Sequence, residues 1–226
     1  MQKKVKKKKL NLFKVFIFLL ILCFTGLSIY FYCNTNTKNI IIKGNSYYSD
    51  DEIIELAELK DYPKFITVNS FRIEKNIKHE NLIKNVDVNK KFGFIVEINI
   101  TEKKVLYQRK SDNLYLLDTG EEISADYIEG VPLLINYYPN TLNEKALKAF
   151  GKLTPETLSK ISSIEYSKTE VDDERFLLFM TDGNLVYINL SRMDKLNKYT
   201  EIVNEFGTKK GILNLDSGNY FEVKEK

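Results

Sequence analysis

Cysteine and histidine are scarce in this chain of 226 residues, and tryptophan is absent. Both cysteines, Cys23 and Cys33, fall in one apolar run near the N-terminus, so the rest of the chain must be held together by core burial without disulfides. The single histidine, His79, has no partner histidine or cysteine outside that run. These absences exclude a zinc site and a histidine-activated nucleophile, and we predict neither metal nor cofactor.

Two frequent enzyme motifs are also missing. The chain contains no Gly-x-Gly, which argues against a phosphate-cradling loop, and no Ser-x-x-Lys, which argues against penicillin-binding chemistry. We therefore expect a protein that is not an enzyme.

What the chain does contain is a strongly polarised N-terminus. Seven lysines and no acidic residue lie in the first 14 residues, ahead of an uncharged apolar run from Val15 to Cys33. At 1.5 Å per residue this run reaches about 28 Å, close to the hydrocarbon thickness of a bilayer. The run is longer than the apolar core of a cleaved signal, and no small-x-small site follows it. The pattern predicts a cytoplasmic tail (1–14), a transmembrane helix (15–33) and an extracytoplasmic remainder.

The charge of the remainder argues against nucleic acid as a partner. The whole chain carries 34 basic and 31 acidic residues, but the first 14 residues contribute seven of the positive charges. Residues 15–226 therefore have a mildly acidic balance. The basic character of the whole chain belongs to its tail, so no basic face for nucleic acid is expected.

The extracytoplasmic part has the pattern of an α+β protein. A β-branched strand at 39–43 is followed by a helix that Ser49 caps and by a second helix from Ser70 to about His79. Two strands, 86–89 and 94–100, then form a predicted hairpin. Beyond Lys104 the chain is mostly strands, interrupted by helices at about 143–153 and 192–206. We expect two domains, 34–104 and a β-rich domain with flanking helices at 105–226.

One pattern resembles a catalytic motif. Asp118-Thr119-Gly120 and Asp216-Ser217-Gly218 both match the short signature of aspartic proteases, in which two carboxylates share a proton. Glu121 replaces the small residue that normally follows the first motif, and little chain follows the second. An Asp-x-Gly after an apolar strand is also typical of a tight turn, the interpretation favoured here. A membrane-anchored enzyme using Asp118 and Asp216 is the alternative.

A set of short segments resembles one known family. The opening Ile40-Ile41-Ile42-Lys43-Gly44-Asn45, followed by Ser49-Asp50-Asp51-Glu52-Ile53, is similar to the start of a POTRA module, and the 86–102 region is similar to its closing hairpin. The form is that of the bacterial cell-division family FtsQ, called DivIB in Gram-positive bacteria. Later segments, including Leu117-Asp118-Thr119-Gly120 and Leu213-Asn214-Leu215-Asp216-Ser217-Gly218, resemble that family's second domain in order and spacing. Leu82, Gly93 and Asn214 depart from its usual residues.

The resemblance implies a non-enzymatic divisome scaffold at the division septum. Members of the family bind the bitopic coiled-coil proteins FtsL and FtsB (DivIC in Gram-positives) outside the membrane and help to control septal wall synthesis. Their second domain receives a partner by β-augmentation at its last strand. Carried over, the expected partner-binding residues are those of that strand pair and a supporting helix: Leu213, Leu215, Asp216, Ser217, Gly218, Tyr220, Phe221, Val223, Lys195 and Tyr199.

The last strand also gives a sharper expectation. Because adjacent strand residues point to opposite faces, at most one of Tyr220 and Phe221 can face the core. The outward residue is the expected anchor for the partner. A different POTRA-type export or chaperone component remains a further alternative, although such proteins normally carry several POTRA copies.

Overall fold

The computed structural model describes residues 11–223. Helix α1 (Leu12–Asn34) has a mean hydropathy of 2.5 in its most apolar window and an exposed surface along its length, and within 11–223 it is the one helix long and apolar enough to cross a membrane. Residues 1–10, which hold six of the seven lysines of the predicted tail, lie outside the described part. The chain divides into an N-terminal unit, Met1–Glu102, and a C-terminal unit, Lys103–Lys226.

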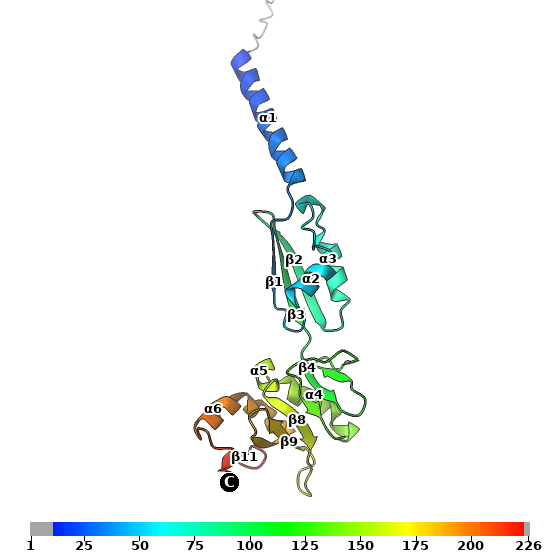
Figure 1. The fold of residues 1–226 in the computed structure, drawn as a ribbon, viewed down its shortest axis with the longest axis vertical. Coiled ribbons are helices and arrows are strands. Elements are labelled where there is room, and N and C mark those ends of the chain that lie inside the picture. The colour runs from blue at the N-terminus through cyan, green and yellow to red at the C-terminus, as the bar shows by residue number, and fades with distance from the viewer. Residues whose placement is uncertain (1–10, 224–226) are drawn as a thin grey trace, which may run out of the picture. The chain divides into compact units, whose positions relative to one another are not determined.

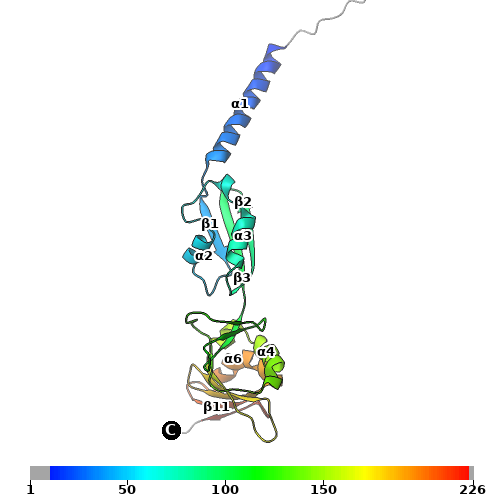
Figure 2. The ribbon, with the colours of Figure 1, turned by 90° about the vertical axis from the view of Figure 1, so that its right-hand side faces the viewer.

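The N-terminal unit contains the predicted strand-helix-helix-strand-strand order, which the structure confirms (Figure 1). Its elements after α1 are β1 (Asn39–Lys43), α2 (Asp50–Leu56), η1 (Phe65–Thr67), α3 (Ser70–Lys78), β2 (Ile83–Lys91) and β3 (Ile95–Glu102). The sheet order is β1-β3-β2, with β1 parallel and β2 antiparallel to β3. Helices α2 and α3 cover one face of this sheet (Figure 2).

Local sequence signals account for the start of this unit. Ser49 caps α2 through a capping box with Glu52, in which the side chain of each residue bonds the backbone N–H of the other. Gly44 closes β1 with φ +84°, and a Cβ there would lie 2.1 Å from the carbonyl oxygen of Ile100. Only glycine fits this turn without displacing β3.

The helix-free face of the small sheet carries a buried acid. Glu97 on β3 has a side chain only 10% exposed and forms ion pairs with Lys43 at 3.2 Å and Lys91 at 2.8 Å. The hydrogen bonds from Lys91, then Lys43 and Asn99, lower the pKa of Glu97 to about 2. The carboxylate therefore joins the edge strands β1 and β2 across the central strand.

We predict that Glu97 makes the stability of this unit dependent on acid pH. Because its pKa is lower in the folded than in the unfolded chain, its contribution is complete above about pH 4.5 and is lost as the pH falls towards about 2. The free energy of unfolding of Glu97→Gln should be lower at pH 7 and should converge on that of the unaltered chain at low pH. Glu55→Gln, at an exposed carboxylate on α2, is the control and should track the unaltered chain. If the free energy of unfolding depended on pH in the same way for all three chains between pH 2 and 7, this role of Glu97 would be contradicted.

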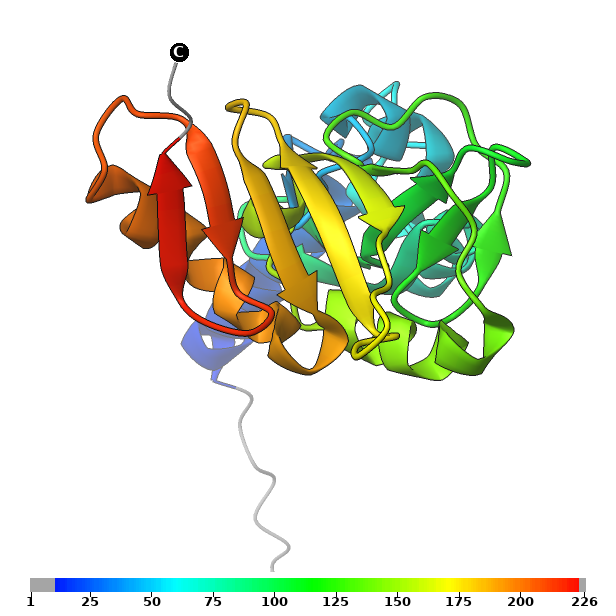
Figure 3. The same cartoon turned by 90° about the horizontal axis from the view of Figure 1, so that it is seen from below.

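The C-terminal unit is built on one large sheet with helices. Over residues 103–223 its nine strands run in the order β12-β11-β10-β9-β8-β7-β4-β5-β6 (Figure 3). The elements are β4 (Val105–Arg109), β5 (Tyr115–Leu117), β6 (Glu122–Ile123), β7 (Leu133–Leu134), η2 (Asn140–Leu142), α4 (Asn143–Gly151), α5 (Pro155–Leu158), β8 (Ile161–Tyr166), β9 (Arg175–Met180), β10 (Leu185–Asn189), η3 (Leu190–Lys198), α6 (Tyr199–Asn204), β11 (Gly211–Asn214) and β12 (Tyr220–Val223).

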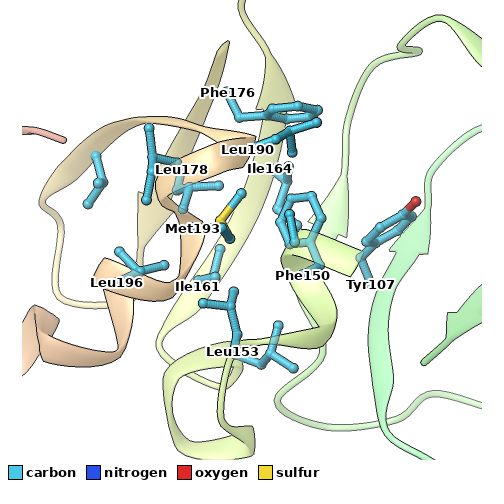
Figure 4. Packing of buried hydrophobic residues seen from close by; sticks show 14 of the residues in the cluster. Tyr107, Phe150, Leu153, Ile161, Ile164, Phe176, Leu178, Leu190, Met193 and Leu196 are labelled. Atoms are coloured by element: carbon cyan, nitrogen blue, oxygen red, sulfur yellow. The ribbon is translucent and has the colours of Figure 1, made fainter. Parts of the chain in front are cut away.

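The core of this unit lies between the sheet and the helical segments. Phe150 of α4 and Phe176 of β9 are fully buried with ring centroids 5.7 Å apart, and Met193 of η3 is buried among them (Figure 4). Tyr107 and Tyr138 share a buried hydroxyl-hydroxyl hydrogen bond of 2.6 Å. Apolar burial of this extent supports a fold without disulfides, as the sequence predicts.

The helix predicted at 192–206 is present, but as two consecutive helical segments of different type. The segment is a 3₁₀ helix, η3, that begins at Leu190 and is followed by the short α6. The buried residues of η3 recur every third position, at Leu190, Met193 and Leu196, and Tyr199 at the start of α6 continues the spacing. This spacing matches three residues per turn, so one face stays buried throughout η3.

Candidate functional site

The expected docking strand, β12, forms one end of the nine-stranded sheet. Within residues 11–223 it pairs with β11 on one side only, in antiparallel register with Leu213 opposite Phe221 and Asn214 opposite Tyr220. Figure 3 shows β12, in red, as the outermost arrow of the row. The backbone groups on its outer side are therefore available to pair with an added strand.

The approach of β12 to β11 depends on one glycine. Gly211 opens β11 opposite Val223, and a Cβ at this position would lie 2.0 Å from the carbonyl oxygen of Glu222 and 2.9 Å from the ring of Phe221. Backbone atoms cannot yield to such a contact as the end of a flexible side chain can. Any larger residue at 211 must displace β12.

The two aromatic residues of β12 lie in different surroundings. Phe221, opposite Leu213, packs against the core and stacks on Phe206 with ring centroids 4.5 Å apart. Tyr220 is 49% exposed. Their difference in burial follows the alternation of a regular strand and makes Tyr220 the outward residue of the pair.

The turn that precedes β12 is anchored by an ion pair. The carboxylate of Asp216 accepts a 2.6 Å bond from Arg175 on β9, and both side chains are less than one fifth exposed. Burial alone raises the pKa of Asp216, but the bonds from Arg175 and from the N–H of Ser217 outweigh it, so the pKa lies below its usual value. The Arg175 guanidinium also lies 3.7 Å from the ring centroid of Tyr187. Asp216 therefore serves as a structural anchor for the turn.

A groove of about 580 Å³ runs between β12 and the helical segments η3 and α6. It brings together five of the expected partner-binding residues, which are Lys195, Leu213, Leu215, Tyr220 and Phe221. Leu213 and Leu215 are buried and form its floor. Asp216, Ser217 and Gly218 belong to the adjoining turn, and Val223 is an exposed residue of β12.

Tyr199 lies inside the unit, away from the surface. Its hydroxyl donates to the carboxylate of Asp182 and accepts from Asn184 at 2.9 Å, and burial raises its pKa. Asn184, fully buried, also accepts a 2.9 Å bond from the N–H of Gly211. Tyr199 therefore contributes to the docking strand pair by positioning the start of β11.

Asn184 is a residue that sequence reasoning missed as part of the site. Asp182-Gly183-Asn184 is typical of a turn and is among the segments that resemble the family's second domain, but nothing in it indicates a contact with a later strand. The hydrogen bond that the N–H of Gly211 donates to Asn184 joins segments 27 residues apart in sequence. Only the folded structure reveals that contact.

The protease alternative fails on strand order. Asp118 follows β5 and Asp216 follows β11, and five strands lie between these two in the sheet. At about 4.8 Å per strand the separation is roughly 29 Å, whereas a shared proton requires carboxylates in direct contact. Asp118 accepts a bond from the N–H of Lys104, and Asp216 pairs with Arg175. The two carboxylates therefore form no catalytic dyad.

Known proteins resemble this chain at two levels, a family model over the first unit and relatives over nearly the whole chain. Residues 35–103 match the family model described as POTRA domain, FtsQ-type. The cell division protein DivIB of Bacillus subtilis is 27% identical over 97% of this chain and 87% of its own length. DivIB of Listeria monocytogenes is 28% identical over 97% of this chain and 85% of its own.

A third relative has a higher sequence identity to this chain than these two. DivIB of Solibacillus silvestris is 31% identical over 83% of this chain and 68% of its own length. The solved extracytoplasmic domain of DivIB from Geobacillus stearothermophilus is 19% identical and covers 45% of this chain and 91% of its own, with a TM-score of 0.39, too low to add to the assignment. On the match to its POTRA module and to relatives along nearly its whole length, the chain belongs to the DivIB family of bacterial cell division proteins.

Proposed function

We propose that this chain is a non-enzymatic scaffold of the divisome that binds FtsL-like and FtsB/DivIC-like coiled-coil proteins outside the membrane and helps to control septal wall synthesis. Its membership of the DivIB family supports a role in cell division. The observation that carries the binding proposal is β12, a strand with one unpaired edge above an apolar groove. An edge strand offers backbone affinity, and the adjoining groove offers side-chain specificity.

The partner segment is proposed to add as a strand beside β12. Its backbone would pair with the free edge, while an apolar side chain enters the groove floored by Leu213 and Leu215. The groove lining carries both signs of charge, with Lys195 and Lys198 beside Asp194 and Glu205, so its specificity is proposed to come from apolar contact. Tyr220 supplies an exposed aromatic anchor at the edge.

We predict that Tyr220→Ala and Phe221→Ala separate binding from stability. Tyr220→Ala should weaken binding of the purified FtsL/FtsB-type partner by about 30-fold or more, the size of a typical anchor residue, at a nearly unchanged melting temperature. Phe221→Ala should lower the melting temperature, since it removes the stack on Phe206. If both variants only lose stability and bind the partner normally once folded, β12 is not the binding edge.

We further propose that the N-terminus is cytoplasmic and that the chain beyond Asn34 lies outside the cell membrane, at the division septum. The α1 helix and the DivIB relatives indicate a single-pass membrane protein, and the lysine excess before α1 supports this orientation.

Protease added to intact, wall-stripped cells tests this orientation. It should degrade residues 34–226 and spare a tag placed on the N-terminus. A cytoplasmic protein followed in the same sample controls for lysis. Full protection of the C-terminal unit in intact cells, with digestion after permeabilisation, would reverse the orientation.

A further inference from the structure

The residues that follow α1 are bound to the folded N-terminal unit by backbone hydrogen bonds. The backbone of Phe65 donates to Thr35 at 3.0 Å, and Thr37 donates to Pro63 at 2.9 Å. The N–H of Lys38 donates to Phe94 at 2.8 Å. Since α1 ends at Asn34, chain geometry keeps these partners within about 10 to 15 Å of the helix end.

Aromatic contacts reinforce the junction. The ring of Phe65 lies 5.5 Å from that of Phe94, and Tyr32, in the last turn of α1, lies 6.3 Å from the first and 6.1 Å from the second. Lys90 bonds the carbonyl oxygens of Phe65 and Val68 and lies 4.5 Å from the ring centroid of Phe65. The loop before η1 and the β2–β3 hairpin are thereby held beside the end of the spanning helix.

Apolar side chains on these same segments remain exposed. Phe92, at the tip of the β2–β3 hairpin, is fully exposed, while Tyr62 and Ile66, on either side of the start of η1, are 42% and 45% exposed. Three exposed apolar groups on segments gathered at one end of a small unit are unfavourable in water. They suit the interface of a bilayer, where a ring can enter the boundary between headgroups and acyl chains.

Positive charge accompanies them. Lys38, Lys60 and Lys64 lie on the same segments, and none of them forms an ion pair within residues 11–223. Lys64 does donate a hydrogen bond to the amide oxygen of Asn34. Asp61 is the acidic residue among them, so the three lysines leave a positive balance.

We propose that Lys38, Lys60, Tyr62, Lys64, Ile66 and Phe92 form a membrane-docking patch that seats the N-terminal unit on the headgroup layer of anionic lipid. The headgroup region extends about 5 to 8 Å beyond each side of the hydrocarbon core. The tethered segments begin at this depth because Phe65 and Phe94 contact Tyr32 in the last turn of the spanning helix. Each lysine near an anionic surface adds attraction, and the apolar side chains add burial. The patch is on the N-terminal unit, so the proposal is independent of partner binding at β12.

The absence of tryptophan gives a direct test. Phe92→Trp places a single tryptophan at the hairpin tip of the full chain, reconstituted in vesicles of phosphatidylglycerol and phosphatidylcholine. Its emission should shift to the blue, and lipids carrying a spin label near the headgroup should quench it more than lipids labelled deep in the chain. Val171→Trp, at a 96% exposed position of the C-terminal unit, is the matched control and should keep the emission of a water-exposed indole.

Charge provides the second arm. In the Phe92→Trp background, the triple change Lys38→Gln, Lys60→Gln and Lys64→Gln should lower the ratio of docked to undocked units by on the order of 100-fold. Salt at about 1 M should also lower the ratio of docked to undocked units when the lysines are unaltered, because it screens their charge. This measurement tests the role of charge even if the triple variant does not fold. Water-like emission and no shallow quenching for Phe92→Trp would overturn the proposal. The proposal would also be overturned if the quenching stayed the same in high salt, in vesicles of pure phosphatidylcholine and in the lysine variant.

Discussion

Gly211→Ala is expected to weaken partner binding at the edge of the large sheet strongly while the rest of the chain stays folded. The added methyl would lie 2.0 Å from the carbonyl oxygen of Glu222, so β12 must leave its register with β11. Since the proposed partner pairs with β12, we expect at least a 30-fold loss of affinity, equivalent to about 2 kcal/mol. Isothermal titration of the purified variant with the FtsL/FtsB-type partner measures this loss.

Gly151→Ala is the matched control for this experiment. Gly151 ends α4, and an added Cβ there meets no atom within 4 Å. Alanine at this helical position should leave binding unchanged and leave stability equal or slightly higher. If Gly211→Ala bound the partner as tightly as Gly151→Ala does, the docking strand would lie elsewhere.

Phe176→Ala is expected to give the largest loss of stability in the C-terminal unit. Its ring is fully buried in β9, near the centre of the sheet, with ring centroids 5.4 Å from Tyr166 and 5.7 Å from both Tyr138 and Phe150. Removing such a ring leaves a cavity that the surrounding side chains fill incompletely, at a cost of about 3 to 5 kcal/mol. The melting temperature should fall by roughly 10 to 20 °C.

The same variant tests whether the two units unfold independently. Phe176→Ala should shift the transition of the C-terminal unit and leave that of the N-terminal unit in place, because the substitution lies within Lys103–Lys226. Tyr127→Ala, at an 83% exposed position of the same unit, should change the free energy of unfolding by less than about 0.5 kcal/mol. A loss from Phe176→Ala no larger than that from Tyr127→Ala would mean that this core is not what stabilises the unit.

Much of the N-terminal unit could be predicted because its signals are local. Ser49 and Glu52 mark the start of α2 within four residues, and the alternation of Val96, Ile98 and Ile100 identifies a strand with one buried face. The two-residue strands β6 and β7 were missed because runs this short carry no detectable period, and they form where neighbouring strands supply their hydrogen bonds. The single-turn helix α5 was also missed, although Thr154 caps it and Pro155 begins it.

For the candidate site, the sequence located the last strand but not its surroundings. Strand alternation required Tyr220 and Phe221 to differ in burial. The register of β12 and the stack on Phe206 determined that Phe221, partly buried, is the one that faces the core. Tyr199, expected as a supporting residue of the site, is buried in a network with Asp182 and Asn184.

By itself the sequence determined the spanning helix, the α+β class and the order of the first unit, because length, hydropathy, caps and alternation are properties of neighbouring residues. The tertiary structure alone decided which strand is the edge, that five strands separate Asp118 from Asp216, and that Asn184 holds the start of β11. These features arise from pairings between residues far apart in the chain. Their order in space is set by the burial of one common core, which no short segment encodes.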